Sequence, residues 1–187
     1  MNEFQVDQLI EACRAAIGGA GAQKAVHEIL ARAVSNPARV IAALGEPAAA
    51  GIQKLHHAAD LTILNIVWAP KMTLFPHNHN MWAVIGIYGG REDNIFWKRM
   101  PASDGVVEAA GAKSLGERDA VMLGRDVIHS VTNPVARLTG AIHVYGGDFF
   151  NAPRSEWDPE TLREQACDIP RLVRQFEEEN RRWFAAR

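Results

Sequence analysis

The sequence is poor in cysteine, in long apolar runs and in excess charge of one sign, and each shortage excludes a class of protein. Two cysteines, Cys13 and Cys167, among 187 residues exclude a disulfide framework and favour reduced thiols. No apolar run approaches the about 18–20 residues of a membrane helix, and the N-terminus has acidic residues where a signal peptide has basic ones. The 20 Lys and Arg against 22 Asp and Glu leave a net charge of −2, without the basic field that holds nucleic acid. We therefore expect a cytoplasmic protein whose partners are neither membranes nor nucleic acids.

Aromatic residues are nearly absent from residues 1–60, where Phe4 is the single one, and all five Trp lie further along the chain. Apolar residues in this first part recur at helical spacing. Ser35-Asn36-Pro37 has the pattern of a helix cap followed by proline in the first turn, and the short helix that it opens runs to Leu44. We therefore expect residues 1–60 to form a helical segment that packs on the rest of the protein.

Residues 61–147 change to a pattern of short strands with Gly, Pro, Asn and Asp between them. The strand-like runs are Leu61–Trp68, Met81–Tyr88, Ile95–Met100, Ala120–Leu123, Val127–Thr132 and Leu138–Tyr145. Several short strands without helices between them indicate an antiparallel sandwich or barrel over residues 61–150. Residues 151–187 return to a helical pattern, with helix starts at Asp158-Pro159 and at Asp168 with Pro170. The predicted fold is mainly β, in one compact domain with helices at both ends.

Histidine is concentrated where the strands are predicted. Four of the seven histidines lie there: His77, His79, His129 and His143. Side chains alternate along a strand, so His77 and His79 point to the same side, as a grip of two nitrogens on one metal requires. His129 lies on another predicted strand, with Asn133 four residues later. Taken singly, each histidine is equally well interpreted as a hydrogen-bonded polar residue at a strand end.

Together, His-x-His and the later His with Asn four residues on resemble the two motifs of the cupins. This resemblance implies a double-stranded β-helix barrel with a metal at its mouth, held here by His77, His79 and His129. The first cupin motif usually adds a Glu, where this sequence has Ala83 or Val84, so a three-histidine site remains. Three neutral imidazoles leave a divalent metal its full charge, which favours an anionic ligand such as a thiolate.

The segment from Ala141 to Tyr145 resembles a further pattern, the Ser-x-His-x-Tyr of the thiol dioxygenases, with Ala141 in place of the Ser. A Trp nine residues before the first histidine, Trp68, is also similar to cysteine dioxygenase. The resemblance covers about residues 60–155. It implies that the Tyr145 hydroxyl points at the metal and that His143 is hydrogen-bonded to it. The alternative is that His143 and Tyr145 form a pair inside the barrel without a chemical role.

A substrate carboxylate requires a cation, and residues 51–60 contain no Arg. In the similar 3-mercaptopropionate dioxygenases an Arg follows the Tyr by nine residues, and Arg154 stands at that distance from Tyr145. This resemblance makes Arg154 the candidate carboxylate clamp, with Lys54 as the alternative cation and a loop salt bridge as the structural alternative. Val84 stands where the animal enzymes have the Cys that is cross-linked to the Tyr, so we expect no such cross-link.

The resemblance to the thiol dioxygenases thus implies a metal-dependent enzyme that adds both atoms of O₂ to the sulfur of a small thiol such as cysteine or 3-mercaptopropionate. Iron(II) is the expected metal, and nickel, manganese or zinc are alternatives in the purified protein because imidazole binds them all. Two other hypotheses stay open: a three-histidine dioxygenase that cleaves a carbon–carbon bond of a diketone-like substrate, and a cupin that binds a small ligand without catalysis. The sequence does not decide whether the protein is a homo-oligomer.

Overall fold

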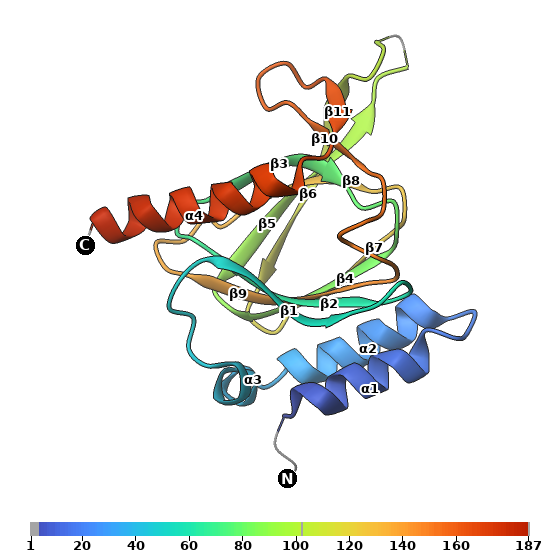
Figure 1. Cartoon of the computed structure of the whole chain (residues 1–187), viewed down its shortest axis with the longest axis vertical. Coiled ribbons are helices and arrows are strands. Elements are labelled where there is room, and N and C mark those ends of the chain that lie inside the picture. Colours follow the sequence, from blue (N-terminus) through green and yellow to red (C-terminus); the bar gives the residue numbers. More distant parts are fainter. Residues whose placement is uncertain (1–3, 102, 187) are drawn as a thin grey trace.

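Two antiparallel sheets face each other and form the body of the protein (Figure 1). The computed structural model describes residues 4–101 and 103–186. One sheet has five strands in the order β1-β2-β9-β4-β7, and the other has six in the order β11-β10-β3-β8-β5-β6. The strands are β1 (Gly51–His57), β2 (Thr62–Trp68), β3 (Thr73–Asn78), β4 (Ala83–Gly89), β5 (Arg91–Arg99), β6 (Val107–Gly116), β7 (Ala120–Leu123), β8 (Ile128–Thr132), β9 (Thr139–Tyr145), β10 (Ser155–Trp157) and β11 (Glu164–Ala166).

The eight strands from β2 to β9 have the order of a jelly roll. The chain passes from one sheet to the other at nearly every turn, so that β2-β9-β4-β7 faces β3-β8-β5-β6. This arrangement is the double-stranded β-helix, which leaves a packed space between the sheets. The predicted fold class, mainly β with helices at both ends, is confirmed. The remaining strands, β1 and the β10–β11 pair, extend the edges of the two sheets.

The strands β2, β4 and β9 are buried on both faces, and alternation decides which side chains enter the barrel. On β2, Leu64 and Ile66 belong to the core between the sheets, whereas Ile63 belongs to a second core beneath the five-stranded sheet. On β9, His143 and Tyr145 occupy inward positions. Each fully buried large aliphatic side chain stabilises the fold by about 1.5–3 kcal/mol. Packing in the two cores therefore fixes which face of β9 points inward, and with it the positions of His143 and Tyr145.

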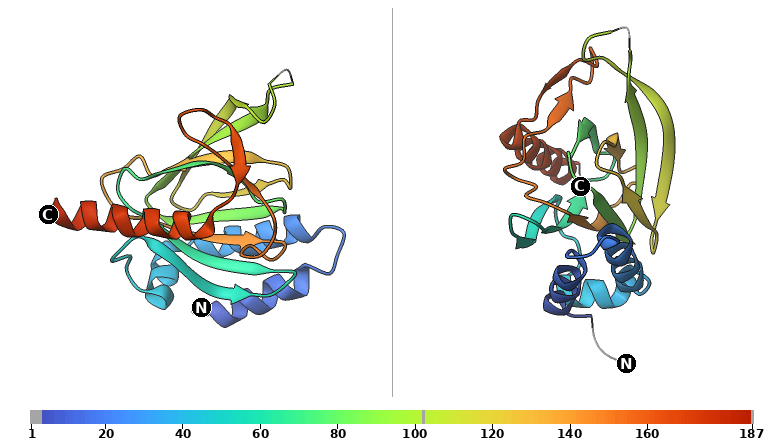
Figure 2. Two further views of the ribbon diagram at one scale, coloured as in Figure 1. Left: turned by 45° about the horizontal axis from the view of Figure 1, so that its top comes forward. Right: turned by 90° about the vertical axis from the view of Figure 1, so that its right-hand side faces the viewer.

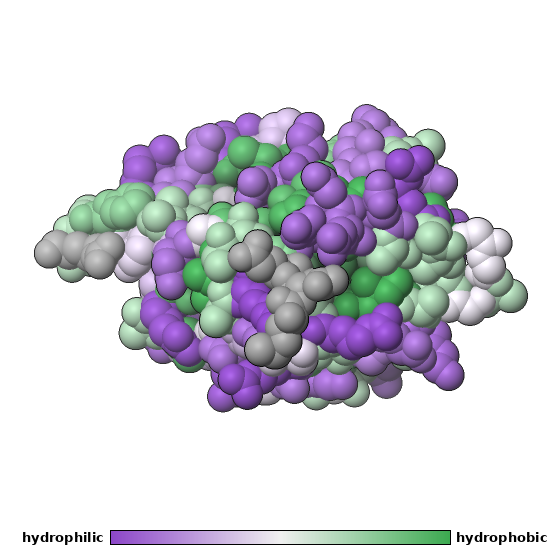
Figure 3. Space-filling model, turned by 90° about the horizontal axis from the view of Figure 1, so that it is seen from below, coloured by the Kyte–Doolittle hydropathy of each residue, from purple (hydrophilic) through white to green (hydrophobic). Residues whose placement is uncertain are grey.

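Three helices form a layer beneath the five-stranded sheet (Figure 2). They are α1 (Val6–Ala16), α2 (Ala22–Val34) and α3 (Pro37–Leu44). As predicted, α3 begins after Asn36, whose side chain accepts the backbone N–H of Arg39, and Pro37 lies in its first turn. Helix α2 approaches the sheet closely at Gly86, where a Cβ would lie 2.8 Å from Leu30 Cγ. Both hydrophilic and hydrophobic residues cover the outer face of this layer (Figure 3).

Helix α4 (Ile169–Ala185) lies across the open side of the sandwich (Figure 1). The side chain of Asp168 caps it by accepting the backbone N–H of Arg171, as the sequence predicts. Its Leu172 and Phe176 side chains are buried against the core between the sheets. The Asn180 amide anchors its far end through two hydrogen bonds to the backbone of Ala50, at 2.7 and 2.8 Å. No helix in the described part of the chain is long and apolar enough to span a membrane.

The first difference from the sequence prediction is β1, which lies inside the segment 1–60 that we expected to be helical. Residues Gly51–His57 pair with β2 in an antiparallel register that slips at a bulge between Lys54 and His56. Polar and basic side chains in this strand obscure a two-residue period. They are typical of an edge strand, where charge discourages pairing with other molecules. The pairing with β2 therefore decides the conformation.

The second difference lies within residues 151–187, where the helix expected at Asp158-Pro159 does not form. Asp158 accepts the backbone N–H groups of Glu160 and Thr161, at 3.1 and 2.8 Å, as it would at a helix start. The chain then reverses at Leu162, which has a positive φ of 54°, and the strands β10 and β11 pair on either side. The hydrogen bonds that Asp158 accepts therefore stabilise a turn between two strands and do not start a helix.

Candidate metal centre

The structure brings His77, His79 and His129 together inside the barrel. His77 lies directly opposite His129 on the neighbouring strands β3 and β8, and His79 follows one residue after the end of β3. All three side chains are at most 5% exposed. One ring nitrogen from each lies within 4.8 Å of the others, and the Nε2 atoms of His79 and His129 are 2.9 Å apart.

Hydrogen bonds on the far side of two rings fix which nitrogen faces the cluster. His77 Nδ1 donates to the backbone carbonyl of Phe75 at 2.9 Å, so a neutral His77 has its lone pair on Nε2. His129 Nδ1 lies 2.7 Å from Asn94 Oδ1, an acceptor, with the same consequence for its Nε2. The Nδ1 of His79 is buried and has no hydrogen-bond partner among the residues that the structure describes.

Burial keeps the three imidazoles neutral. Burial lowers the pKa of His77 from 6.5 to about 4. Burial, together with neighbouring imidazoles, holds the pKa of His79 and of His129 well below 6.5. All three rings are therefore uncharged at neutral pH and have lone pairs to offer, which is the form in which histidine binds metals.

The three side chains fit a divalent metal. Two imidazole nitrogens that bind one metal at about 2.1 Å and at right angles lie about 3 Å apart, and the Nε2 atoms of His79 and His129 are 2.9 Å apart. Three nitrogen ligands leave further coordination positions free for substrates. His77, His79 and His129 could therefore hold a transition metal at the inner end of the cavity described next.

A narrow cavity between the sheets adjoins these histidines. Its free volume is about 20 Å³, enough for about one water molecule. The lining is the three histidines with Ile52, Ile66, Trp68, Leu74, Val131, His143, Tyr145, Phe149, Leu172 and Phe176. Leu172 and Phe176 belong to α4, so this helix forms one wall of the cavity.

The structure also places His143 and Tyr145 in this cavity and in contact with each other. The Tyr145 hydroxyl lies 3.1 Å from His143 Nδ1, and the Tyr145 ring centroid lies 4.9 Å from that of His79. Burial raises the pKa of Tyr145 well above 10, so the hydroxyl keeps its proton at any physiological pH. Ala141, which stands in place of the Ser of the resemblance, offers no hydrogen bond to His143. A carboxylate on another strand lies near that ring instead.

That carboxylate, Glu92 of β5, was not singled out from the sequence. It is fully buried, and its Oε2 lies 3.4 Å from His143 Nε2, an ion-pair distance without the alignment of a hydrogen bond. Trp68 Nε1 donates to the same oxygen at 2.9 Å, and Asn94 Nδ2 donates to Oε1 at 3.0 Å. Glu92 and Asn94 share one face of β5, and this alternation was the signal for a buried position that the sequence offered. The charged neighbours Arg91 and Asp93 hide it, because they make the segment resemble a turn.

Arg154 and Lys54, the candidate cations, do not line the cavity. Arg154 is 8% exposed, donates to the carbonyl of Phe149, and stacks on the Phe149 ring at 3.9 Å from its centroid. Among the described residues, its Nε has no hydrogen-bond partner and no carboxylate forms an ion pair with it. Burial is the main cause that lowers the pKa of His77 and of His79, and the positive charge of Arg154 is a further cause. Lys54 is exposed, over the ring of Phe150.

Asn133, four residues after His129, does not face the metal centre. It is fully buried and bridges loops between the sheets. Its amide donates to the carbonyls of Trp68, Ala69 and Arg137, and its oxygen accepts from Val135 N–H and the Thr139 hydroxyl. The second motif therefore combines one residue of the metal centre with one that holds the scaffold.

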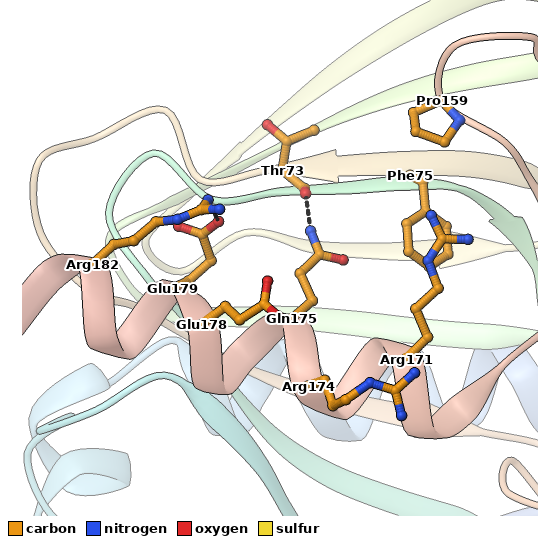
Figure 4. A pocket seen from close by; sticks show the side chains of 9 residues that line it. All are labelled: Thr73, Phe75, Pro159, Arg171, Arg174, Gln175, Glu178, Glu179 and Arg182. Atoms are coloured by element: carbon orange, nitrogen blue, oxygen red, sulfur yellow. Dashed lines mark hydrogen bonds and ion pairs between the residues drawn. The ribbon is translucent and has the colours of Figure 1, made fainter.

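A second, open hollow of about 510 Å³ lies between α4 and β3, on the outside of the protein (Figure 4). Its three arginines are neutralised by neighbouring carboxylates: Arg171 by Glu156, Arg174 by Asp168 and Arg182 by Glu179. Because these charges are already paired, the hollow has little positive charge left to attract an anionic ligand.

No model of a known protein family matches the sequence, and no curated protein matches it. Among solved structures, the protein is similar to an RmlC-like cupin with a double-stranded β-helix fold from Methanocaldococcus jannaschii, at 14% identity over 56% of this chain and 85% of that one, with a TM-score of 0.46. It is also similar to a DMSP lyase from Ruegeria pomeroyi (18% identity, 55% and 46% covered, TM-score 0.42) and to oxalate decarboxylase from Bacillus subtilis (15% identity, 50% and 22% covered, TM-score 0.40). At these values the similarities extend no further than the fold, and the assignment of the double-stranded β-helix rests on the strand order of the two sheets.

Proposed function

We propose that this protein is a metal-dependent dioxygenase that oxidises the sulfur of a small thiol with O₂, using iron(II) held by His77, His79 and His129. The observation that carries the proposal is the meeting of three neutral, buried imidazoles with the protonated hydroxyl of Tyr145 in one narrow cavity. In the reaction, the thiol R–SH and O₂ give the sulfinic acid R–SO₂H. Both oxygen atoms enter the product, and no further reductant is needed.

A divalent metal bound by the three imidazoles would supply the charge that draws a thiolate and the open positions that bring sulfur and O₂ together. The protein's own residues orient the reactants and exclude water. The Tyr145 hydroxyl, held by His143, would hydrogen-bond to oxygen or give it a proton. The apolar lining would protect the partly oxidised sulfur from side reactions with water.

A substrate larger than one water molecule enters only if the wall of the cavity moves. Leu172 and Phe176 are the side chains that α4 contributes; they pack in the core, and polar contacts such as the bond from Gln175 Nε2 to the Thr73 carbonyl, at 2.6 Å, also join the helix to the barrel. The guanidinium of Arg154 does not line the cavity, but it stacks on Phe149, which does, and it is buried and lacks an ion-pair partner in the described part of the chain; a substrate carboxylate would reach it if the Phe149 side chain moved aside. This supports a thiol carboxylic acid as the substrate class.

The test is oxygen uptake by iron-loaded protein with a panel of thiols. Purified protein is reconstituted with iron(II) under anaerobic conditions, and O₂ consumption is followed with cysteine, 3-mercaptopropionate and cysteamine. We expect uptake with at least one thiol, with one sulfinate formed per O₂ as measured by mass spectrometry. Iron-loaded protein that consumes no O₂ with any thiol would contradict the proposal. Uptake with a diketone alone would favour carbon–carbon cleavage.

A further inference from the structure

Glu92 is a buried carboxylate without a fixed cationic partner. It is 0% exposed, and in the described residues its one ion-pair contact is with His143, which is charged only when protonated. Its hydrogen-bond partners, Trp68 and Asn94, are neutral. Burying a carboxylate in this way is unfavourable, so its position calls for a function that a neutral side chain would not serve.

One arm of contacts leads from Glu92 to the metal centre. A carboxylate accepts hydrogen bonds and cannot donate them, so Asn94 turns its Nδ2 toward Glu92 Oε1. The Asn94 Oδ1 then faces His129 Nδ1 at 2.7 Å, which requires the proton of His129 to lie on Nδ1. As a result, the lone pair of His129 lies on Nε2, the atom next to His79.

The other arm leads from Glu92 to Tyr145. Glu92 Oε2 lies 3.4 Å from His143 Nε2 and favours a proton on that nitrogen. A neutral His143 then has its lone pair on Nδ1, where it accepts the Tyr145 hydroxyl at 3.1 Å. The direction of the Tyr145 O–H bond thus depends on the same carboxylate as the lone pair of His129.

We propose that Glu92 is a positioning residue that sets the ring protons of both His129 and His143, and that it must be a carboxylate because both of its oxygens have to accept. The inference rests on the metal-binding part of the proposed function and is independent of the substrate. A glutamine has one accepting oxygen. If its amide faced Asn94, Asn94 would have to reverse, and the proton of His129 would move to the nitrogen that binds metal. If the amide faced His143, it would also face Trp68 Nε1–H, which can only donate, so that bond would be lost; in addition the proton of His143 would move to Nδ1 and the bond to Tyr145 would reverse.

Two measurements test this. Long-range ¹H–¹⁵N NMR of zinc-loaded wild-type protein reports which ring nitrogen of His143 carries hydrogen, and we expect Nε2. Hydrogen on Nδ1 in the wild type would overturn the inference without any variant. In Glu92→Gln we expect the ring proton of His129 or His143 to move, and the affinity for Zn(II), measured by competition with a chelator, to fall about 10–100-fold when His129 is the one affected.

The control is Glu164→Gln, the same chemical change at a carboxylate on β11 whose partners are Arg99 and Ser155 instead of a histidine. It should leave the Zn(II) affinity and both ring protons unchanged. If Glu92→Gln does not fold, Asn94→Ala cuts only the arm to His129. It should weaken Zn(II) binding while the proton of His143 stays on Nε2.

The outcomes separate this inference from the proposed function. Unchanged ring protons together with unchanged Zn(II) affinity in Glu92→Gln would overturn the role of Glu92 alone. Wild-type protein that binds no metal would overturn both the proposed function and the arm through His129.

Discussion

Replacing Asn133 with alanine should destabilise the protein strongly and leave the metal centre intact. The Asn133 side chain is fully buried and makes five hydrogen bonds to the loops around it, at 2.9–3.2 Å. An alanine removes these bonds from three carbonyls, one N–H group and the Thr139 hydroxyl, of which the Ala69 carbonyl keeps the Met72 N–H and the Thr139 hydroxyl keeps the Arg91 carbonyl. Each buried polar group that loses its partner costs about 1–3 kcal/mol, and the losses around one side chain overlap because the loops relax.

We therefore expect Asn133→Ala to lower the free energy of unfolding by about 3–5 kcal/mol. For a chain of this size, 1 kcal/mol corresponds to about 2–4 °C, so Tm should fall by about 6–20 °C. The assay is thermal unfolding followed by circular dichroism, with metal content measured well below Tm. Asn151→Ala is the control, because Asn151 is exposed and its side chain bonds to Asp148 alone among the described residues, so Tm should stay nearly constant.

A Tm of Asn133→Ala within about 2 °C of the wild type would refute the reasoning about buried hydrogen bonds. Loss of metal at an unchanged Tm would contradict the assignment of Asn133 to the scaffold, because the residue would then belong to the metal centre.

Three further predictions follow from the centre. Tyr145→Phe should keep fold and metal but lower kcat for thiol oxidation by about 10²–10⁴-fold, with a milder loss in His143→Ala; an unchanged kcat in Tyr145→Phe would mean that the pair has no chemical role. Arg154→Ala should raise KM steeply for a thiol carboxylic acid and hardly for cysteamine, since breaking a partly buried charged pair costs about 2–5 kcal/mol; equal effects on both substrates would place the clamp elsewhere. Because the pKa of His77 is about 4 in the folded protein and 6.5 in the unfolded chain, the unfolded chain takes up the proton first. His77 alone should therefore cost the metal-free protein about 3 kcal/mol of stability as the pH falls from 6.5 to 4, and His79 and His129, whose pKa values are also lowered, add to this loss; urea unfolding measures it, and a flat profile would contradict buried, neutral imidazoles.

The sequence predicts the barrel because its central strands are short, apolar and bounded by turn residues. Alternation along β9 is enough to place His143 and Tyr145 on one face, and the structure shows them in contact at 3.1 Å. The His-x-His spacing likewise indicates that His77 and His79 approach each other. Which other strand lies opposite them is a matter of tertiary pairing, and resemblance to the cupins supplied His129.

Glu92 and the wall of the cavity could not be predicted in this way. A glutamate between Arg91 and Asp93 is ordinarily solvated, and it is buried here because β5 continues alongside β8 and faces the interior with alternate residues. Leu172 and Phe176 have the spacing of any amphipathic helix, and that pattern does not say which surface the helix covers. Contacts between distant segments decide both features, and these have no local signal in the sequence.

The central claim is that His77, His79 and His129 bind one metal ion, and elemental analysis of purified protein tests it most directly. We predict about one transition-metal ion per chain in the wild type, and loss of most of it in His129→Ala because three ligands leave no redundancy. The control is His57→Ala, which should retain the metal. His57 lies at the end of the outer strand β1, is partly exposed and pairs with Asp148. Full metal occupancy in His129→Ala would contradict the account.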